Sequence, residues 1–176
     1  MSNIINIKAF HKGLSLPVSL EYLVLLILVA NGAPILIRNI LDDTASYPLD
    51  AGITLCDHYP VFGHSKTWRG VFASVIFTVI AALLLGYDFV FGLMISVLAM
   101  AGDLLSSFIK RRLRMQPSRM APFLDQVPES LFPALYMMLV LSLAWQDVLF
   151  IVMVFILLEI VLSKILYRLG IRQRPY

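Results

Sequence analysis

Charged residues are scarce in this chain of 176 residues. They make up 14% of it, whereas a soluble globular domain carries roughly a quarter, and the mean hydropathy is +0.86. This shortage of charge, with 60% hydrophobic residues, excludes an ordinary soluble domain and indicates an integral membrane protein. The net charge is only +3, so the positions of the charges carry more information than their sum.

Cysteine is nearly absent, and several common site patterns are missing. The single cysteine, Cys56, excludes an intramolecular disulfide, a CxxC redox pair and a cysteine-rich metal site. The GxxxxGK[ST] spacing of a Walker A loop does not occur, and His58 and His64 lack the spacing of paired metal ligands. No repeat, low-complexity tract or soluble domain is evident, so residues 1–176 are predicted to form one membrane-embedded domain.

Apolar runs of about the length that a bilayer requires account for most of the chain. The predicted spans are Val18–Ile37, Val71–Leu85, Phe89–Ile109, 129–145 and 148–167. The expected fold is therefore an all-α integral membrane protein with about five transmembrane helices and two long cytoplasmic loops. A cleaved signal peptide is the alternative for the first run, but Pro34 and the continuing apolar character favour a helix.

Two features inside the spans are unusual. Asn31-Gly32-Ala33-Pro34 is expected to interrupt the first helix, either where it lines a cavity or where it packs on a neighbour. Glu159 lies within the last span, where a charge usually faces the bundle interior. Its role, as a structural partner or as part of a site, stays open.

The basic residues lie almost entirely on one side of this topology. Five spans place the loops Arg38–Arg69 and Lys110–Pro128 on the same side as the C-terminal tail. That side holds 12 of the 14 lysines and arginines, and only Lys8 and Lys12 lie opposite. The positive-inside rule then places the loops and the C-terminus in the cytoplasm and the N-terminus outside, in the cell membrane.

The stretch from Ala101 to Gln126 combines acids with a dense basic cluster. On a helix Asp103, Ser106/Ser107 and Lys110 share one face, with Lys110 about 10 Å further along the axis than Asp103. A carboxylate at membrane depth is costly unless it meets a cation, a metal or water. Asp125 supplies a second acid after the loop. Two acids beside this cluster suit a divalent metal that holds a polyphosphate; the cluster comprises Lys110, Arg111, Arg112, Arg114 and Arg119.

A second polar motif, Phe62–Gly70, stands directly before an apolar helix. It contains small residues, hydroxyl groups and the cations Lys66 and Arg69. Backbone N–H groups at a helix start, next to such cations, form a suitable site for an anion. The alternative is a solvated basic loop.

Taken together, these motifs resemble a known enzyme family. Gly102-Asp103-Leu104, Ser107–Arg111 and Leu124-Asp125-Gln126 resemble the C-terminal signature of CTP-dependent phosphatidate cytidylyltransferases. Asn31–Pro34, Pro48–Gly52 and Phe62–Gly70 look more like the archaeal-type branch, the CDP-archaeol synthases. The similarity runs from about residue 31 to residue 126, with the motifs in the same order.

The resemblance implies a reaction and a set of site residues. CTP and a membrane lipid phosphate, either phosphatidate or an archaeal-type glycerol phosphate lipid, would give a CDP-activated lipid and pyrophosphate with Mg²⁺ as cofactor. Asp103 and Asp125 match the metal-binding acids, and Lys110 is the third catalytic candidate. The substrate-binding candidates are Asn31, Asp50, Ser65, Lys66, Thr67, Arg69, Ser107 and Arg111. Arg112 and Arg114 are left for lipid headgroups.

The chain departs from the bacterial form of the signature at Ser106, which stands in place of an acid, and at Gln126, which replaces an arginine. These departures favour the archaeal-type branch and leave the identity of the lipid substrate open.

The expected partners are CTP, the lipid phosphate and membrane lipids, with no nucleic acid; whether the protein forms an oligomer is left open. The competing hypotheses are an anion transporter, a non-catalytic subunit that binds anionic lipid, and a CDP-alcohol phosphotransferase.

The predicted orientation can be tested at Cys56, which lies in the first cytoplasmic loop. A membrane-impermeant maleimide should leave Cys56 unlabelled in intact cells and label it after the membrane is opened, because the positive-inside rule places this loop inside. Labelling in intact cells would reverse the orientation.

Overall fold

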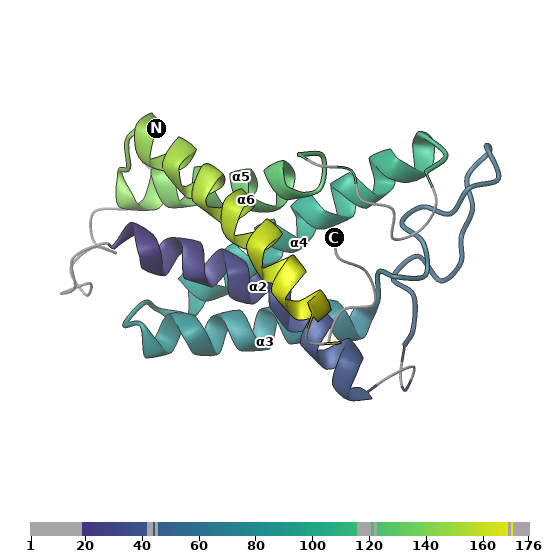
Figure 1. The fold of residues 1–176 in the computed structure, drawn as a ribbon, viewed down its shortest axis with the longest axis horizontal. Coiled ribbons are helices and arrows are strands. Elements are labelled where there is room, and N and C mark those ends of the chain that lie inside the picture. The colour runs from purple at the N-terminus through teal and green to yellow at the C-terminus, as the bar shows by residue number, and fades with distance from the viewer. Residues whose placement is uncertain are drawn as a thin grey trace, which may run out of the picture.

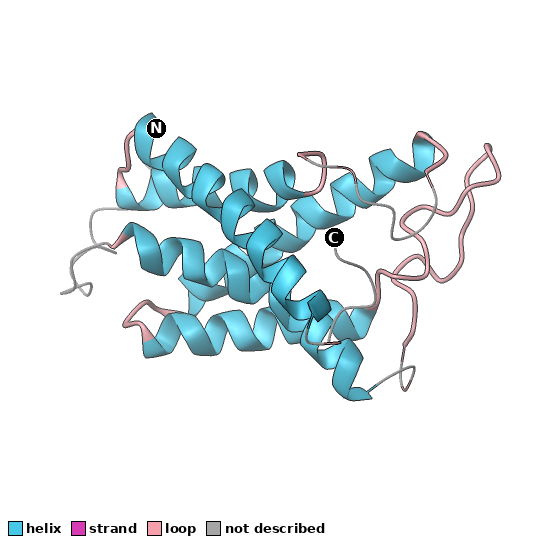
Figure 2. Ribbon diagram, viewed as in Figure 1, coloured by secondary structure: helices cyan, strands magenta, loops and turns pink. Residues whose placement is uncertain are grey.

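The computed structural model describes residues 19–41, 44, 46–115, 121, 123–168 and 170. Within these ranges the regular structure is helical (Figures 1 and 2), apart from two isolated β-bridges. The helices are α2 (Leu20–Leu41), α3 (Trp68–Leu84), α4 (Phe89–Arg112), α5 (Gln126–Leu141) and α6 (Trp145–Arg168). The predicted all-α fold with five helices is confirmed. The basic residues Lys8, Lys12, Arg119, Arg172 and Arg174 lie outside the described residues.

Three of the helices are long and apolar enough to cross a membrane. These are α2, α4 and α6, with 22, 24 and 24 residues; α3 and α5 are also apolar but shorter, with 17 and 16 residues. The fourth predicted span, 129–145, is displaced. The helix begins at Gln126 and ends at Leu141. It ends there because Ser142 adopts a left-handed conformation, with φ 54°, that terminates the helix.

The expected interruption of the first helix is not present. α2 continues through Pro34 to Leu41, and the Asn31 side chain donates to the Ile27 carbonyl 3.1 Å away, one turn earlier in the same helix. Pro34 instead meets the start of α3 at Gly70, where an added Cβ would lie 3.3 Å from the proline ring. The motif therefore serves the packing of α2 on α3.

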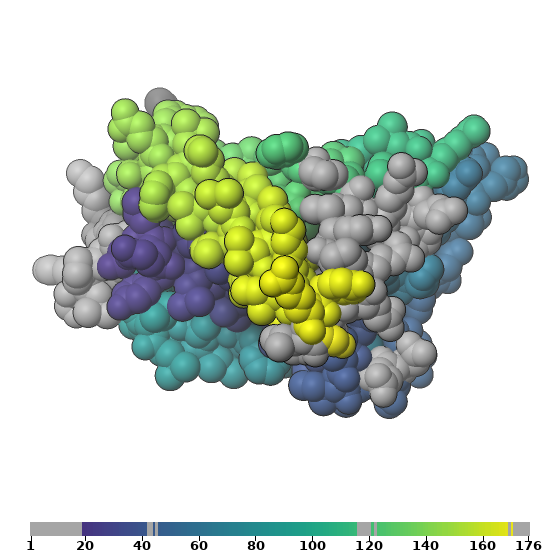
Figure 3. Space-filling view, in the orientation of Figure 1, coloured from purple at the N-terminus to yellow at the C-terminus, as the bar shows by residue number. Residues whose placement is uncertain are grey.

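The helices bury an apolar core and turn a second apolar surface outward. Leu26 and Ile27 of α2, Ile95 of α4 and Phe155 of α6 are fully buried. α6 crosses diagonally over α2 on the face shown in Figure 3, and its outer side chains such as Met153 are well exposed. Large apolar side chains on the outside are expected where the solvent is lipid.

Short and long connections lie at opposite ends of the bundle (Figure 1). The turns 85–88 and 142–144 close one end, and the polar loop 44–67 projects from the other. Arg112 at the end of α4 anchors this loop, since its guanidinium donates to the Asp57 carboxylate at 2.8 Å and to the Tyr59 and Pro60 carbonyls. The expectation that Arg112 serves lipid headgroups is therefore corrected.

Asp50 organises the same loop from within. Only 6% of it is exposed, and its carboxylate accepts hydrogen bonds from the backbone N–H groups of Gly52, Phe62 and Gly63 at 3.1, 2.9 and 2.8 Å. Burial by itself raises the pKa of Asp50, but these donors outweigh it and hold the pKa below its usual range. Asp50 therefore remains ionised at neutral pH and fixes the turn that precedes Lys66.

Close packing of α3 on α4 at Gly92 gives a prediction about stability. A methyl group at Gly92 would lie 2.7 Å from Ala82 Cβ and 2.9 Å from Val79 Cα. Gly92→Ala should therefore destabilise the protein by about 1–3 kcal/mol, measured as a lower midpoint of thermal unfolding in detergent. Gly32→Ala in α2 is the matched control, because nothing lies within 4 Å of its added methyl. If the midpoint of thermal unfolding falls equally in both variants, close packing at Gly92 is not the cause of the loss.

The Asp50 turn gives a prediction about pH. Because the pKa is lower in the folded than in the unfolded chain, the folded state binds fewer protons, and the stabilisation is complete above about pH 4 and declines as the pH falls further. Hydrogen exchange of residues 46–67 should therefore be constant from pH 5 to 8, after correction for intrinsic rates, and accelerate near pH 3. Asp50→Asn should accelerate it at every pH, whereas Asp147→Asn at the opposite end should not. Wild-type exchange in Asp50→Asn would contradict the role of the carboxylate.

Candidate active site

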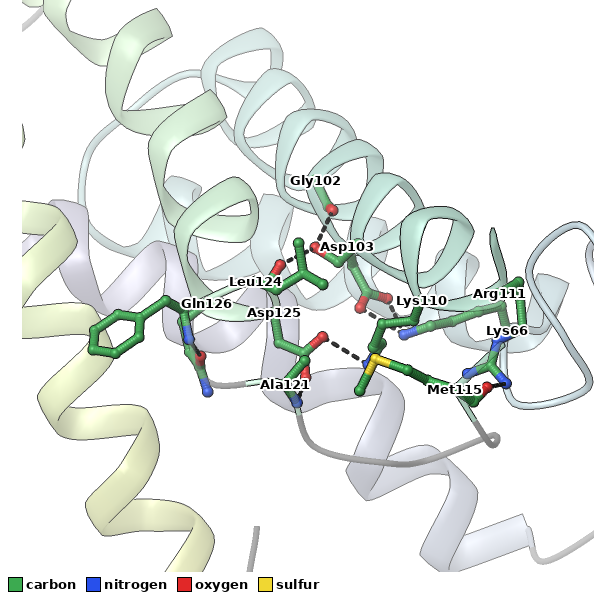
Figure 4. Close-up of polar contacts among 12 residues, drawn as sticks. Lys66, Gly102, Asp103, Lys110, Arg111, Met115, Ala121, Leu124, Asp125 and Gln126 are labelled. Atoms are coloured by element: carbon green, nitrogen blue, oxygen red, sulfur yellow. Dashed lines mark hydrogen bonds and ion pairs between the residues drawn. The ribbon is translucent and has the colours of Figure 1, made fainter. Parts of the chain in front are cut away.

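An ion pair between Lys66 and Asp103 connects the loop to α4. The Lys66 ammonium lies 2.5 Å from both carboxylate oxygens of Asp103 (Figure 4), and the side chains are 24% and 20% exposed. Burial lowers the pKa of Lys66, but the Asp103 carboxylate, followed by Glu129, more than compensates and the net pKa is raised. Lys66 is therefore a cation at neutral pH, and Asp103 has the partner that a carboxylate on a membrane helix requires.

The local structure around Lys66 explains its position. The Leu49 N–H donates to the Lys66 carbonyl at 2.7 Å, and the Trp68 N–H donates to the Tyr47 carbonyl at 3.1 Å. Thr67 then caps α3, since its hydroxyl oxygen accepts from the Gly70 N–H at 3.2 Å. Lys66 is thus held directly before the Thr67 cap of α3, where it pairs with Asp103 of α4.

A second ion pair lies next to the first and has the reverse arrangement. Here α4 supplies the cation, Lys110, and the segment before α5 supplies the acid, Asp125, with 2.6 Å between ammonium and carboxylate (Figure 4). The other carboxylate oxygen of Asp125 accepts from the Ala121 N–H at 3.1 Å. The two pairs bring together Lys66, Asp103, Lys110 and Asp125 from three segments: the loop before α3, α4, and the segment before α5.

Glu129 in the first turn of α5 is a third acid at this point, which the sequence reasoning did not identify. It is 7% exposed, and its side chain hydrogen-bonds that of Asp103. Glu129 lies four residues after Asp125, at the start of the same helix, and this spacing could have identified it from the sequence. No group of three or more His, Cys, Asp or Glu side chains in the described part of the chain is arranged to hold a metal ion by itself.

A cavity of about 330 Å³ opens beside the Lys66–Asp103 pair, between α2, α3 and α4. Its cationic and polar lining contains five of the predicted site residues: Ser65, Lys66, Thr67, Arg69 and Asp103. Arg38 and His64 also line it and were not predicted. The remaining wall is apolar and includes Val71, Met100 and Leu104. The cavity therefore combines cationic side chains with an apolar wall.

The other predicted site residues are not among those that line this cavity. Asn31 bonds within α2, and Asp50 holds the loop turn. Ser107 is 3% exposed on α4; Arg111 is also 3% exposed and donates to the Met115 carbonyl at 2.6 Å. That these four residues bind substrate stays a prediction, and their position away from the cavity lining adds no support to it.

Comparison with known proteins agrees with this arrangement. Residues 14–176 match the family described as CarS-like, CDP-archaeol synthase. The CDP-archaeol synthase of Sulfolobus acidocaldarius is 32% identical over 155 residues, which cover 85% of this chain and 91% of that protein. That of Staphylothermus marinus is 28% identical over 159 residues, covering 85% and 87%. That of Hyperthermus butylicus is 37% identical over 106 residues, covering 57% and 60%.

A solved structure of an intramembrane enzyme for the biosynthesis of archaeal membrane lipids has the same fold. It superposes with a TM-score of 0.65 at 29% sequence identity, covering 81% of this chain and 90% of the other. The transporter and lipid-binding alternatives are set aside by this result. The chain belongs to the CDP-archaeol synthase family and is, as the sequence predicted, a membrane-embedded, CTP-dependent lipid cytidylyltransferase.

Proposed function

We propose that the two neighbouring ion pairs form the catalytic centre at which CTP and a membrane lipid phosphate react. The observation that carries this proposal is the meeting of Lys66–Asp103 and Lys110–Asp125 beside a cavity with a cationic lining and an apolar wall. Two phosphate-bearing substrates need several fixed cations, and one of them brings apolar tails. The archaeal-type lipid in the names of the relatives and phosphatidate are both candidates for that substrate.

The chemistry needs positioning and charge neutralisation more than covalent help from the protein. An oxygen of the lipid phosphate attacks the α-phosphorus of CTP and forms the new P–O bond. The bond from the α-phosphorus to the oxygen that bridges to the β-phosphate breaks, and pyrophosphate leaves with that electron pair. No general base is required, because the nucleophile is already an anion near neutral pH.

The basic side chains have separate tasks in this proposal. Arg38, Lys66 and Arg69 line the cavity and bind phosphate oxygens of one substrate. Lys110 lies on the other side of Asp103, along α4, and stabilises charge on the pyrophosphate that leaves. Cations that are fixed before the reaction need little reorganisation as negative charge shifts in the transition state.

The acids present fit a divalent metal, the cofactor that the resemblance to CTP-dependent cytidylyltransferases implies. Asp103 and Asp125 offer hard carboxylate oxygens, each beside a lysine. Mg²⁺ is usually bound by one or two carboxylates together with substrate phosphates, which agrees with the lack of a complete protein cage in the described residues. When bound, Mg²⁺ neutralises phosphate charge and favours departure of pyrophosphate. Asp103 and Asp125 are the proposed ligands.

The orientation in the cell membrane belongs to the same proposal. CTP is a cytoplasmic nucleotide, and the site lies at the end of the bundle from which the loop 44–67 projects (Figure 1). The positive-inside rule places that end in the cytoplasm, with the N-terminus outside.

Turnover by the purified protein tests the proposal. Labelled CTP should enter a CDP-lipid only when a lipid phosphate and Mg²⁺ are present, with phosphatidate and an archaeal-type lipid phosphate offered in separate reactions. Asp103→Asn and Asp125→Asn should each lower kcat at least about a hundredfold, because asparagine keeps the shape but removes the charge that binds metal.

Asp147→Asn is the matched control, since Asp147 lies at the opposite end of the bundle and accepts only a local bond from the Ala144 N–H. Activity is expressed per folded molecule and measured across a Mg²⁺ titration. If an asparagine variant keeps the wild-type kcat and metal dependence, that aspartate does not belong to the site. If activity falls only in proportion to folded yield, the acids are structural partners of the lysines.

A further inference from the structure

Three positions of α4, each one turn from the next, contact residues 124–128, the end of the segment before α5 together with the first turn of α5. Gly102 lies against the Pro128 carbonyl so closely that an added Cβ would collide with it. Ser106, one turn later, donates through its hydroxyl to the Leu124 carbonyl at 2.7 Å. Lys110, a further turn on, pairs with Asp125. Spacing of four residues places all three on one face of the helix.

The middle contact is the only one of the three in which a side chain holds the backbone of that segment. Ser106 is 1% exposed, and its hydroxyl also reaches the Gly102 carbonyl of its own helix at 2.9 Å. Figure 4 shows the Leu124 carbonyl directed toward α4 immediately before Asp125. Because Leu124 and Asp125 share a peptide bond, a fixed Leu124 carbonyl restricts where the Asp125 side chain begins.

The other hydrogen bonds of the described residues in this segment run within it or to the first turn of α5. The Asp125 N–H donates to the Ala121 carbonyl, and the Phe123 N–H donates to the Gln126 side chain at 2.9 Å. Phe123 has a φ of 65°, a left-handed conformation that is costly for a side chain of this size. Internal bonds shape such a turn but do not set its distance from α4.

We propose that Ser106 is a positioning residue: by holding the Leu124 carbonyl against α4, its hydroxyl places Asp125 opposite Lys110 in the geometry that turnover requires. The placement of the segment rests on the contacts above, and the consequence for turnover rests on the proposed function. Ser106 itself touches no substrate in this proposal. Its effect passes through Asp125.

Ser106→Ala tests the proposal, because alanine removes the donor and keeps the helix. Ser96→Ala is the matched control: Ser96 is also buried on α4, and its hydroxyl bonds to the Leu93 carbonyl of the same helix at 2.8 Å. Hydrogen exchange of residues 123–131 is measured first, without substrate or metal. It should be about three- to tenfold faster in Ser106→Ala, which corresponds to the loss of one hydrogen bond, and unchanged in Ser96→Ala.

Kinetics then separate positioning from general damage. Ser106→Ala should lower kcat about ten- to a hundredfold, with the KM for CTP changed less than about threefold, because a misplaced Asp125 impairs the reaction more than nucleotide binding. Unchanged exchange in residues 123–131 overturns the proposal, as does faster exchange with a wild-type kcat. Changes of the same size in exchange and in kcat for Ser96→Ala overturn the proposal too. A wild-type protein that does not turn over CTP would contradict the proposed function, while the exchange measurement still decides whether Ser106 holds the segment.

Discussion

A carboxylate on a helix within an apolar layer needs a cation, and much of this structure serves to provide one for Asp103. The cation comes from Lys66, 37 residues earlier, in the polar loop before α3. The Asp50 turn, the pairing of Tyr47 with Trp68 and the Thr67 cap together place that one ammonium group. Loss of either partner would leave an uncompensated charge, at a cost of about 3–5 kcal/mol. The geometry of the loop and the packing of α4 therefore depend on each other.

The helices could be predicted from the sequence because long apolar runs have few alternatives in a membrane. The common face of Asp103 and Lys110 followed from helical periodicity in the same way. The partners of these residues could not be derived, since Lys66 and Asp103 meet only through the packing of α3 on α4. Glu129 was missed for a different reason: the predicted span starts at residue 129, so its acid stands at the very end of an apolar run, where a charge is ordinary, whereas the helix begins three residues earlier and carries Glu129 beside Asp103.

Motif membership does not reveal what a side chain contacts. Asp50 and Asn31 occur in motifs of the family, and in the structure one holds a turn and the other bonds to its own helix, so their predicted part in binding substrate stays a prediction. The basic cluster was predicted to divide between phosphate and lipid headgroups, and the structure shows which protein groups its members contact. Lys110 pairs with an acid, Arg111 donates to the chain just after α4, and Arg112 anchors the loop. Charge counting gives the orientation of the protein, but only the fold assigns each charge its partner.

The order of the paired residues along the chain has a consequence for biosynthesis. In the two partly buried pairs the lysine precedes its acid, 66 before 103 and 110 before 125, so a ribosome makes each cation first. When the helix that carries Asp103 enters the bilayer, the loop with Lys66 has already been synthesised and can neutralise the arriving charge. In the third ion pair, Asp57 precedes its partner, Arg112, and that acid is 34% exposed, where water can solvate it while the rest of the chain is translated. For Asp103 and Asp125, the nascent chain therefore already contains the cation when the carboxylate is made.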